Sequence, residues 1–375
     1  MIKWEVKKLG EVCTLQRGFD LPKNLREKGD YPLISSSGEI DTHCEPKVKS
    51  PGIVTGRSGS IGSLFFVEKD FWPLNTTLFV KDFHGNDPRF IFYLLKHFDL
   101  GRFASGTGVP TLNRNHVHDE KINITTSLKE QKRIVEILDK AFEGIAQAEA
   151  NTRRNLINAR ELFDSYLNNI FRERGDEWTD KNLKDIAIEF GRGKSKHRPR
   201  NDKKLYGGNY PFVQTGDIRN SDHIVTNYSQ TYNDTGLAQS KLWKKGTVCI
   251  TIAANIAETA VLDFDACIPD SVIGLLVDDQ KANNMFVEYM LQSFKLMLQS
   301  KGKGSAQDNI NMGTFKDLVF PFPPDLEIQQ DIVEKLDFLS SAKQKLETIY
   351  QSKLEAIAEL KQSILEKAFT GQLSQ

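Results

Sequence analysis

The residues best suited to hold a charged partner are seven Lys and Arg side chains between Arg192 and Lys204, accompanied by one acid, Asp202. Pro199 and two nearby glycines disfavour a regular helix, so the segment is expected to be a loop. A loop this basic suits phosphate contacts, and an arginine in the major groove can grip guanine. A solvated charge run would look the same in isolation. The DNA-contact hypothesis names Arg192, Lys194, Lys196, Arg198 and Arg200.

A glycine-rich loop at 56–62 follows a predicted strand and carries Arg57, Ser58 and Ser60. It has neither the spacing of a P-loop nor that of a dinucleotide fingerprint, so nucleotide binding is not expected. Its side chains are candidates for contacts to a nucleic-acid backbone or base, and a tight turn between strands is an equal alternative. The counterpart at 253–256 has lost the glycines, which leaves its role open; Asn255 is the candidate there.

A third polar stretch contains Thr111, Asn113 and Arg114, and residues Asn309 and Asn311 belong to its counterpart in the second half. These side chains are suited to hydrogen bonds with bases or phosphates, and a loop cap is the plain alternative. The nearby His-x-His pair at 116 and 118 has no third or fourth ligand close by in sequence, so a zinc site is not expected.

Two patterns imitate catalytic sites. The Phe-Pro-Pro-Asp run ending at Asp325 resembles an amino-methyltransferase motif, but phenylalanine stands where Asn or Asp must bind the amine; a stiff linker fits better. Asp270, Asp279 and Lys281 match a loose metal-nuclease pattern, although the equivalent of Asp270 in the first half is Asn75. A metal-dependent nuclease therefore stays an alternative. No Ser/His/Asp or Cys/His set stands out.

The elements that must position these candidates occur twice in the chain. The segment from Leu128 recurs from Leu326 at a constant interval of 198 residues. Such a duplication predicts two equivalent units related by pseudo-symmetry. Seven residue pairs in the first twelve positions are identical: Leu128/Leu326, Gln131/Gln329, Ile134/Ile332, Val135/Val333, Glu136/Glu334, Leu138/Leu336 and Asp139/Asp337.

The repeat extends into the preceding globular segments, where Trp4 corresponds to Trp178 and Arg17-Gly18 to Arg192-Gly193. The interval rises from 174 residues at the tryptophans to 198 at the helices, so the second unit carries about two dozen inserted residues, expected in loops. Each globular segment mixes β-type runs with one helix. The runs are 64–67, 78–80, 247–252 and 272–277, and the helices are 88–98 and 285–298.

Each unit ends in a long proline-free helix, Leu128 to about Arg172 and Leu326 to about Phe369. From Ile134 and Ile332 onward, an imperfect heptad seam repeats at alternating four- and three-residue steps. About 45 residues of helix span roughly 65 Å, more than a small domain can cover. Antiparallel pairing of the two helices would cover both seams and hold the domains apart. A coiled coil that only dimerises chains is the open alternative.

Net charge, cysteine usage and hydropathy narrow the class of protein without deciding its function. The 375 residues include 50 basic and 50 acidic ones, and this zero net charge neither supports nor excludes a polyanion partner. Cys13, Cys44, Cys249 and Cys267 are scattered and are expected to be free, buried thiols in a reducing compartment. The amino terminus has no apolar signal core and no stretch approaches a membrane span. A soluble cytoplasmic protein is expected.

The order domain, long helix, domain, long helix resembles the specificity subunit of type I restriction–modification enzymes. The similarity covers essentially the whole chain, in both halves and in the family's order. The matching signatures are Trp-x4-Leu-x-x-Val/Ile at Trp4 and Trp178, Tyr-Pro-Leu-Ile and Tyr-Pro-Phe-Val at Tyr31 and Tyr210, Gly-x-Val in a later strand, the runs Gly106–Asn113 and Gly304–Asn311, and Leu-x-x-Gln-x-x-Ile-Val-Glu at Leu128 and Leu326.

The resemblance implies an α+β fold: two globular α/β target recognition domains separated by two long antiparallel coiled-coil helices, with a pseudo-two-fold internal repeat. It divides the chain into target recognition domains at 1–127 and 176–325 and spacer helices at 128–175 and 326–375. Each domain would read one half of a bipartite, asymmetric DNA site. Contact candidates are Arg17, Arg57, Ser58, Ser60, Thr111, Asn113, Arg114, Arg192, Lys194, Lys196, Arg198, Arg200, Asn255, Asn309 and Asn311.

The resemblance also implies partners. They are double-stranded DNA, two methyltransferase subunits docked on the helices, and restriction/translocase subunits recruited through that core. This chain would be non-catalytic and hold no cofactor, because S-adenosylmethionine, Mg²⁺ and ATP would belong to the partner subunits. The alternatives are the nuclease using Asp270, Asp279 and Lys281, and a coiled-coil scaffold without a DNA role.

Overall fold

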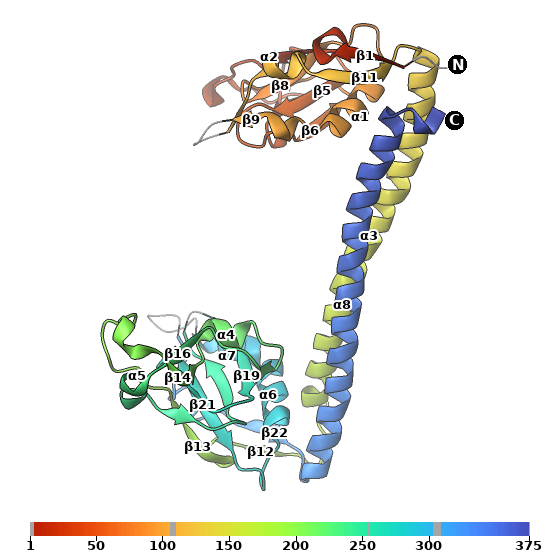
Figure 1. The fold of residues 1–375 in the computed structure, drawn as a ribbon. Coiled ribbons are helices and arrows are strands. Elements are labelled where there is room, and N and C mark those ends of the chain that lie inside the picture. Colours follow the sequence, from red (N-terminus) through yellow and green to blue (C-terminus); the bar gives the residue numbers. More distant parts are fainter. Residues whose placement is uncertain (1–3, 106–109, 254, 303–308, 375) are drawn as a thin grey trace. The chain divides into compact units, whose positions relative to one another are not determined.

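The computed structural model describes residues 4–105, 110–253, 255–302 and 309–374. The chain forms two compact units (Figure 1). Unit 1 comprises residues 1–154 and 350–375, and unit 2 comprises residues 155–349. Each contains one globular domain and parts of both long helices, so the four-part division by sequence stays a prediction. No helix in the described ranges is long and apolar enough to cross a membrane.

Unit 1 places its helices against small sheets that are antiparallel except for the pair β3 and β7. Its elements are β1 (Trp4–Lys8), β2 (Thr14–Arg17), β3 (Tyr31–Ser35), β4 (Gly38–His43), β5 (Gly52–Gly56), β6 (Leu64–Val67), β7 (Trp72–Pro73), β8 (Thr77–Asp82), α1 (Pro88–Phe98), β9 (Ala104–Ser105), β10 (Thr111–Leu112), α2 (Arg114–His118) and β11 (Lys121–Thr125). The main sheet has the order β2-β8-β5-β6, and the others have the orders β4-β3-β7, β1-β11 and β10-β9.

Unit 2 repeats this plan with additions. Its elements are β12 (Thr179–Lys181), β13 (Ala187–Arg192), β14 (Tyr206–Phe212), α4 (Thr215–Arg219), β15 (Ile224–Val225), β16 (Gln230–Tyr232), α5 (Asp234–Ala238), β17 (Leu242–Trp243), β18 (Val248–Thr251), β19 (Thr259–Leu262), β20 (Ala266–Cys267), β21 (Val272–Val277), α6 (Asn284–Ser293), α7 (Lys295–Gly302) and β22 (Phe320–Phe322). The sheet orders are β13-β21-β18-β19-β15, β16-β14-β20-β17 and β12-β22.

The two sheet plans correspond strand by strand. The order β2-β8-β5-β6 of unit 1 is repeated as β13-β21-β18-β19 in unit 2, and β4-β3-β7 is repeated as β16-β14-β20. The internal repeat predicted from the sequence is therefore confirmed. The elements α4, β15, α5 and β17 have no counterpart in unit 1, and they lie where the lengthening interval between the repeats predicts inserted residues.

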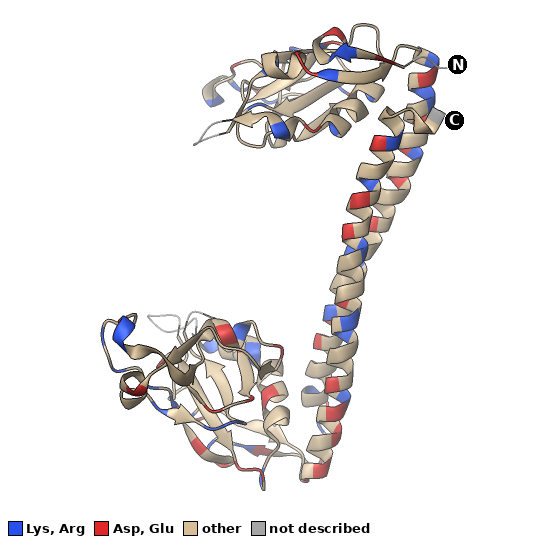
Figure 2. Cartoon of the chain, in the orientation of Figure 1, with Lys and Arg blue, Asp and Glu red and all other residues tan. Residues whose placement is uncertain are grey.

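Helix α3 (Leu128–Arg172) and helix α8 (Leu326–Phe369) begin and end at the predicted residues. They run antiparallel in each unit. In unit 1, Arg133 donates to the Leu373 carbonyl at 2.6 Å and Lys361 pairs with Glu149. Lys361 and Arg153 lower the pKa of Glu149 to about 2. Charges of both signs are interspersed along both helices (Figure 2), as expected for exposed coiled-coil faces.

In unit 2, Arg160 of α3 pairs with Glu347 of α8 at 2.6 Å. Both helices also enter the domain cores. In unit 1, Leu138 of α3 and Phe369 of α8 are buried in the cluster around α1. In unit 2, Phe171 of α3 and Leu336 of α8 are buried in the cluster around α6. Each long helix is therefore an integral part of both units.

The glutamine that recurs at the start of the two long helices anchors each helix to its globular domain. Gln131 is fully buried; its Oε1 accepts from the Asp87 amide at 2.8 Å and its Nε2 donates to the Asn86 side chain and the Thr125 carbonyl at 2.7 and 2.8 Å. Gln329 accepts from the amide of Asn283 at 2.8 Å. Asp87 and Asn283 are the N-caps of α1 and α6, so the repeated glutamine connects equivalent helices.

The repeated aspartate has a similar role. Asp139 accepts from the Tyr93 hydroxyl at 2.6 Å, and Asp337 accepts from the Tyr289 hydroxyl at 2.7 Å. Burial, together with these carboxylates, raises the pKa of both tyrosines, so the hydroxyls stay protonated and can donate. The identical positions found in the sequence therefore fasten helix to domain in each unit.

Replacing Gln131 by alanine is expected to destabilise unit 1 by about 2–4 kcal/mol, because it removes the side-chain partner of the Asp87 amide, the half-buried Asn86 oxygen and the buried Thr125 carbonyl, and opens a cavity. Chemical denaturation of the full chain measures the loss. Gln147, which is exposed on the same helix and bonds only the neighbouring Asn151 side chain, is the matched control. Equal midpoints for the two alanine variants would contradict the anchoring role.

Two sequence expectations are corrected. The predicted helix 285–298 is divided into α6 and α7 at Phe294, whose backbone (φ −90°, ψ 5°) leaves helical geometry where its ring packs edge-on against Phe320 at 5.4 Å. The four cysteines are free, but Cys44 is exposed rather than buried, because it lies in the loop after β4, where its thiol approaches the Glu27 carboxylate at 3.6 Å.

Candidate nucleic-acid interface

Most predicted contact residues of the first half gather around one pocket on unit 1. Arg17 comes from the end of β2, Arg57 from the loop after β5, and Thr111, Asn113 and Arg114 from β10 and the start of α2. The pocket has a volume of about 410 Å³ and is lined by Arg17, Arg57, Leu78, Thr111, Leu112, Asn113, Arg114 and Asn115. Segments almost a hundred residues apart in the chain thus form a single surface.

The backbone around Arg57 is held in place within the glycine-rich loop. The Arg57 amide donates to the Thr76 carbonyl and its carbonyl accepts from the Leu112 amide, both at 2.8 Å. Ser58 forms a β-bridge with Thr111, which places it beside the pocket. Ser60 is exposed on the same loop. Arg57 is half-buried and its backbone is held from both sides, so the residue has little backbone freedom to lose when a ligand binds.

Gly56 is required for this tight loop. A Cβ at this position would lie 2.0 Å from the Ser60 carbonyl oxygen, closer than any side-chain carbon can approach. The glycine therefore allows the chain to fold back on itself immediately before Arg57. The loop is both a strand-to-strand turn and a support for a cationic side chain.

The pocket is electropositive. Arg17 approaches Asp20 at 3.6 Å with both side chains largely exposed, whereas Arg57 and Arg114 form no ion pair within the described part of unit 1. The side-chain oxygen of Asn113 accepts from the Asn115 amide at 3.0 Å and caps α2, so the loop-cap alternative is correct for that atom. Three guanidinium groups with one weak acidic partner suit a phosphate or the acceptor edge of guanine.

The basic segment of unit 2 is arranged differently, because its arginines surround one carboxylate. Arg192 donates to the Asp270 backbone carbonyl. The Asp270 carboxylate accepts from Arg198 at 3.4 Å and from Arg200 at 2.7 Å. Arg198 also donates to the carbonyls of Ser195 and His197 at 2.6 and 2.8 Å, respectively. These arginines therefore fasten the loop to the turn before β21.

Lys194 and Lys196 are the predicted cations of this segment that point to solvent. Both are exposed, and neither ammonium group has a hydrogen bond or ion pair among the residues that the structure describes. Phosphate contacts suit such mobile, hydrated charges. The structure thus divides the predicted set in unit 2 into arginines that shape the loop and lysines that face solvent.

The repeated Arg-Gly dipeptide has a packing reason. A Cβ on Gly18 would lie 2.2 Å from the Leu74 carbonyl oxygen, and one on Gly193 would lie 2.3 Å from that of Pro269. In each unit, only glycine lets the strand end approach this turn. The preceding arginine, Arg17 or Arg192, consequently has the same place in both units.

The other candidates of unit 2 lie on two loops. Asn311 accepts from the amides of Gly313 and Thr314 at 2.7 and 3.2 Å, so its side-chain oxygen caps a turn. Asn309 is half-buried. Residues 303–308 of its motif, and residues 106–109 of the matching motif in the first half, lie outside the described part of the chain. Asn255 accepts from Arg219 at 3.3 Å. Arg219 was not among the sequence candidates, because it belongs to inserted helix α4 and has no counterpart in the first half.

The geometry rejects the nuclease constellation. Asp270 is held by arginines, and Lys281 pairs with Asp278 at 3.4 Å. Asp279 follows β21 while Asp270 precedes it, so roughly 17 Å of extended strand separates the carboxylates. One metal ion cannot bridge that distance. Among the described residues, no group of three or more His, Cys, Asp or Glu side chains could hold a metal ion. His116 and His118 are therefore not part of such a group.

Comparison with known proteins decides the family. The type I restriction modification DNA specificity domain matches residues 1–159 and 175–356, which is most of the chain. The chain belongs to this family of type I DNA specificity proteins. The predicted resemblance, the fold class and the DNA-binding, restriction-system character of the chain are thereby confirmed. Proteins of this family are generally non-catalytic specificity subunits.

The similarity to a curated relative and to two solved structures extends over nearly the full length of this chain. A protein of Methanocaldococcus jannaschii assigned as the type I restriction enzyme MjaX specificity subunit is 21% identical, with 99% of this chain and 93% of that protein covered. Among solved structures, one from a study of complex assembly and conformational transition in the type I R-M system has a TM-score of 0.77 at 19% identity, covering 98% of this chain and 97% of that one. The HsdS subunit from Thermoanaerobacter tengcongensis has a TM-score of 0.59 at 21% identity, covering 98% and 97%.

Proposed function

We propose that this specificity protein is the DNA-reading subunit of a type I restriction–modification complex. Each globular domain reads one half of a bipartite, asymmetric site. The paired helices α3 and α8 dock two methyltransferase subunits and set the gap between the half-sites, and restriction/translocase subunits join through that core. The chain performs no chemistry of its own; S-adenosylmethionine, Mg²⁺ and ATP act on the partner subunits.

The cationic pocket of unit 1 carries this proposal. It brings Arg17, Arg57 and Arg114 together from three separate segments, and the backbone holds the central arginine rigidly. Specific DNA readers need such preorganised donors, because a bidentate arginine distinguishes guanine from the other bases. A coiled-coil scaffold alone does not account for three guanidinium groups from separate segments gathered around one pocket.

Differences between the units support an asymmetric site. Arg57 of unit 1 has no basic counterpart in the equivalent loop of unit 2, and Asp270 has Asn75 as its counterpart in unit 1. Two domains with the same fold and different polar groups would read different bases. Identical domains related by a two-fold axis would require a palindrome.

An apolar groove on unit 2 supports the docking of a methyltransferase subunit. It lies between α3 and α8, has a volume of about 630 Å³, and exposes Phe338 and Leu162 by 73% and 71%. Exposed apolar groups of this size are costly unless a partner covers them. The walls also include Tyr166, Leu339, Leu346 and the charged rim Asp331, Glu334, Lys335 and Lys343. An apolar centre with a polar rim is the usual anatomy of a protein interface.

Replacing Phe338 by alanine is expected to weaken methyltransferase binding roughly thirtyfold, the cost of about 2 kcal/mol for an aromatic hot spot. Folding should be unaffected, since the ring is mostly exposed. Titration calorimetry of the chain with its methyltransferase measures the effect. Ile349, an exposed apolar residue of α8 outside the groove, provides the matched alanine control. An unchanged affinity for the Phe338 variant would contradict docking at this groove.

The assembled complex with methyltransferase tests the function directly. Its binding to duplex DNA should weaken steeply as salt rises, because lysines and arginines displace counterions from phosphates. It should also prefer one duplex sequence over unrelated ones. A complex that forms normally but shows neither property would favour the scaffold alternative.

A further inference from the structure

We propose that Arg219 and Asn255 together form the base-contacting pair of unit 2, at the place where unit 1 uses Arg57, and that they recognise a guanine in the second half-site. The inference rests on the proposed function, since it names the groups through which unit 2 would read DNA. Four observations lead to it. The two hairpin loops are equivalent, and the cation beside the loop of unit 2 comes from a different element. Contacts within unit 2 hold this loop, and the guanidinium face of the pair has only hydrogen-bond donors.

The two loops are topologically equivalent. In unit 1 the loop after Gly56 joins β5 to β6, and in unit 2 the loop after Thr251 joins β18 to β19. Both hairpins are antiparallel and occupy the same positions in corresponding sheets. Arg57 follows β5 directly and lines the cationic pocket of unit 1. A base-contacting group of unit 2 is therefore expected beside the β18–β19 loop.

That loop contains no Lys or Arg between Ile252 and Glu258. The cation comes instead from the last residue of α4, Arg219, whose Nη1 donates to the Asn255 side-chain oxygen at 3.3 Å. Helix α4 is one of the elements that unit 1 lacks. The inserted helix thus supplies unit 2 with a guanidinium group beside a hairpin loop that has none.

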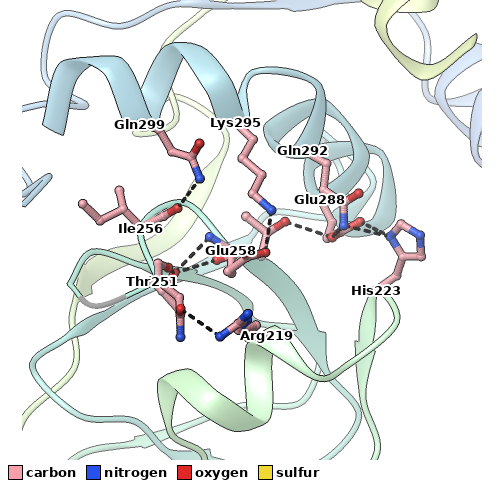
Figure 3. Close-up of polar contacts among 11 residues, drawn as sticks. Arg219, His223, Thr251, Ile256, Glu258, Glu288, Gln292, Lys295 and Gln299 are labelled. Atoms are coloured by element: carbon pink, nitrogen blue, oxygen red, sulfur yellow. Dashed lines mark hydrogen bonds and ion pairs between the residues drawn. The ribbon is translucent and has the colours of Figure 1, made fainter. Parts of the chain in front are cut away.

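Side chains of β18 and α7 hold the loop that carries Asn255 (Figure 3). The Thr251 hydroxyl bonds the Asn255 carbonyl and accepts from the Glu258 amide at 2.9 Å. Gln299 of α7 donates to the Ile256 carbonyl at 3.1 Å, and the Lys295 ammonium group pairs with the Glu258 carboxylate at 2.8 Å. These contacts hold residues 255–258, so little ordering of this part of the loop is needed when a ligand binds.

A buried carboxylate of α6 bonds residues that lie close in sequence to each member of the pair. Glu288 of α6 is fully buried and accepts from the Thr259 hydroxyl, just after the loop, at 2.9 Å. It also bonds the His223 ring at 2.9 Å, four residues after Arg219 (Figure 3). The counterpart of Glu288 in unit 1 is Phe92, whose ring packs edge-on against Phe66 at 5.6 Å. The polar brace is a property of unit 2 alone.

The pair presents hydrogen-bond donors. The Asn255 oxygen accepts from Arg219 and keeps a second lone pair, whereas the guanidinium group has only donors, so the Arg219 face of the pair can only donate. Arg219 is exposed and has no ion pair among the residues described, so no carboxylate competes for it. Guanine offers two acceptors, N7 and O6, on its major-groove edge, whereas adenine offers one acceptor beside a donor. A donor-only face therefore selects guanine.

The test uses the complete complex with methyltransferase subunits and duplexes in which each base pair of the second half-site is replaced in turn. The wild-type complex should disfavour replacement of one guanine by roughly tenfold or more, and Arg219→Ala should reduce that preference to near one. Arg219→Lys should keep most of the affinity and lose the preference, because lysine keeps the charge without the planar fork. Preference in the first half-site should not change.

Other results overturn the proposal in distinguishable ways. Equal weakening of all duplexes by Arg219→Ala would make this residue a phosphate contact only. Unchanged discrimination in both Arg219 variants would remove it from the interface. A wild-type complex with no preference at any position would refute the proposed function itself. Arg57→Ala, altering the first half-site alone, is the reciprocal control, and equal melting temperatures exclude unfolding.

Discussion

Replacing Arg57 by alanine should lower the affinity of the assembled complex for its specific duplex roughly a hundredfold, near the upper end for one bidentate arginine contact. The reason is preorganisation: the side chain is half-buried, its backbone is held from both sides, and no carboxylate competes for it in the described part of unit 1. Competition binding with duplexes substituted at each position of the first half-site measures the effect. Discrimination should vanish at one or two adjacent base pairs.

Lys69→Ala is the matched control, since it removes one positive charge from an exposed site of unit 1 outside the pocket. It should weaken binding slightly and equally for all sequences. If Arg57→Ala behaved in the same uniform way, Arg57 would be a phosphate contact, and base reading by this pocket would be wrong.

Adding one heptad to both long helices should abolish methylation of the native site and create a site whose gap is about three base pairs longer. Seven helical residues add about 10.5 Å, and one base pair rises about 3.4 Å. The additions belong after Arg154 in α3 and after Ile349 in α8, at the boundaries of the two units, so both domain cores keep their own helix segments. A seven-residue block preserves the phase of the seam.

Methylation mapping of host DNA reads the outcome. A substituted heptad of unchanged length at the same two places is the control and should leave the native site intact. Both half-sites should keep their bases in the lengthened variant. A changed half-site, or an unchanged gap in an active complex, would refute the idea that helix length sets the spacing.

The large-scale architecture could be predicted because its signals are local and repeated. The long helices lack proline and carry a seam, and their repeated glutamine and aspartate mark the joints with α1 and α6. The Pro88 helix was predicted with the correct bounds, since Asp87 caps it and proline occupies its first position. The break at Phe294 was missed, because it depends on packing against Phe320, a distant residue.

The candidate site was only partly predictable. Sequence placed Arg17, Arg57 and Arg114 among the contacts, and the fold brings them into one pocket. It could not show that Arg192, Arg198 and Arg200 converge on Asp270, which is 70 to 78 residues away along the chain. A basic run looks alike whether its charges face DNA or an internal carboxylate.

Arg219 illustrates a different limit. The guanidinium group beside the β18–β19 loop comes from an inserted helix and not from the hairpin loop itself. Aligning the two halves cannot reveal such a replacement, because the inserted residues have nothing to align with. The sheet orders of the two units, known only from the structure, identify the equivalent loops.

A methylation map of DNA from a methylation-free host expressing this chain with its methyltransferase partner tests the central claim most directly. The expected result is one motif with two short, different blocks of defined bases around a gap of fixed length, and no mark when this chain is omitted. A continuous or palindromic motif would contradict two-domain reading of an asymmetric site. No mark, despite a soluble complex and a competent methyltransferase, would contradict the DNA-reading role as a whole.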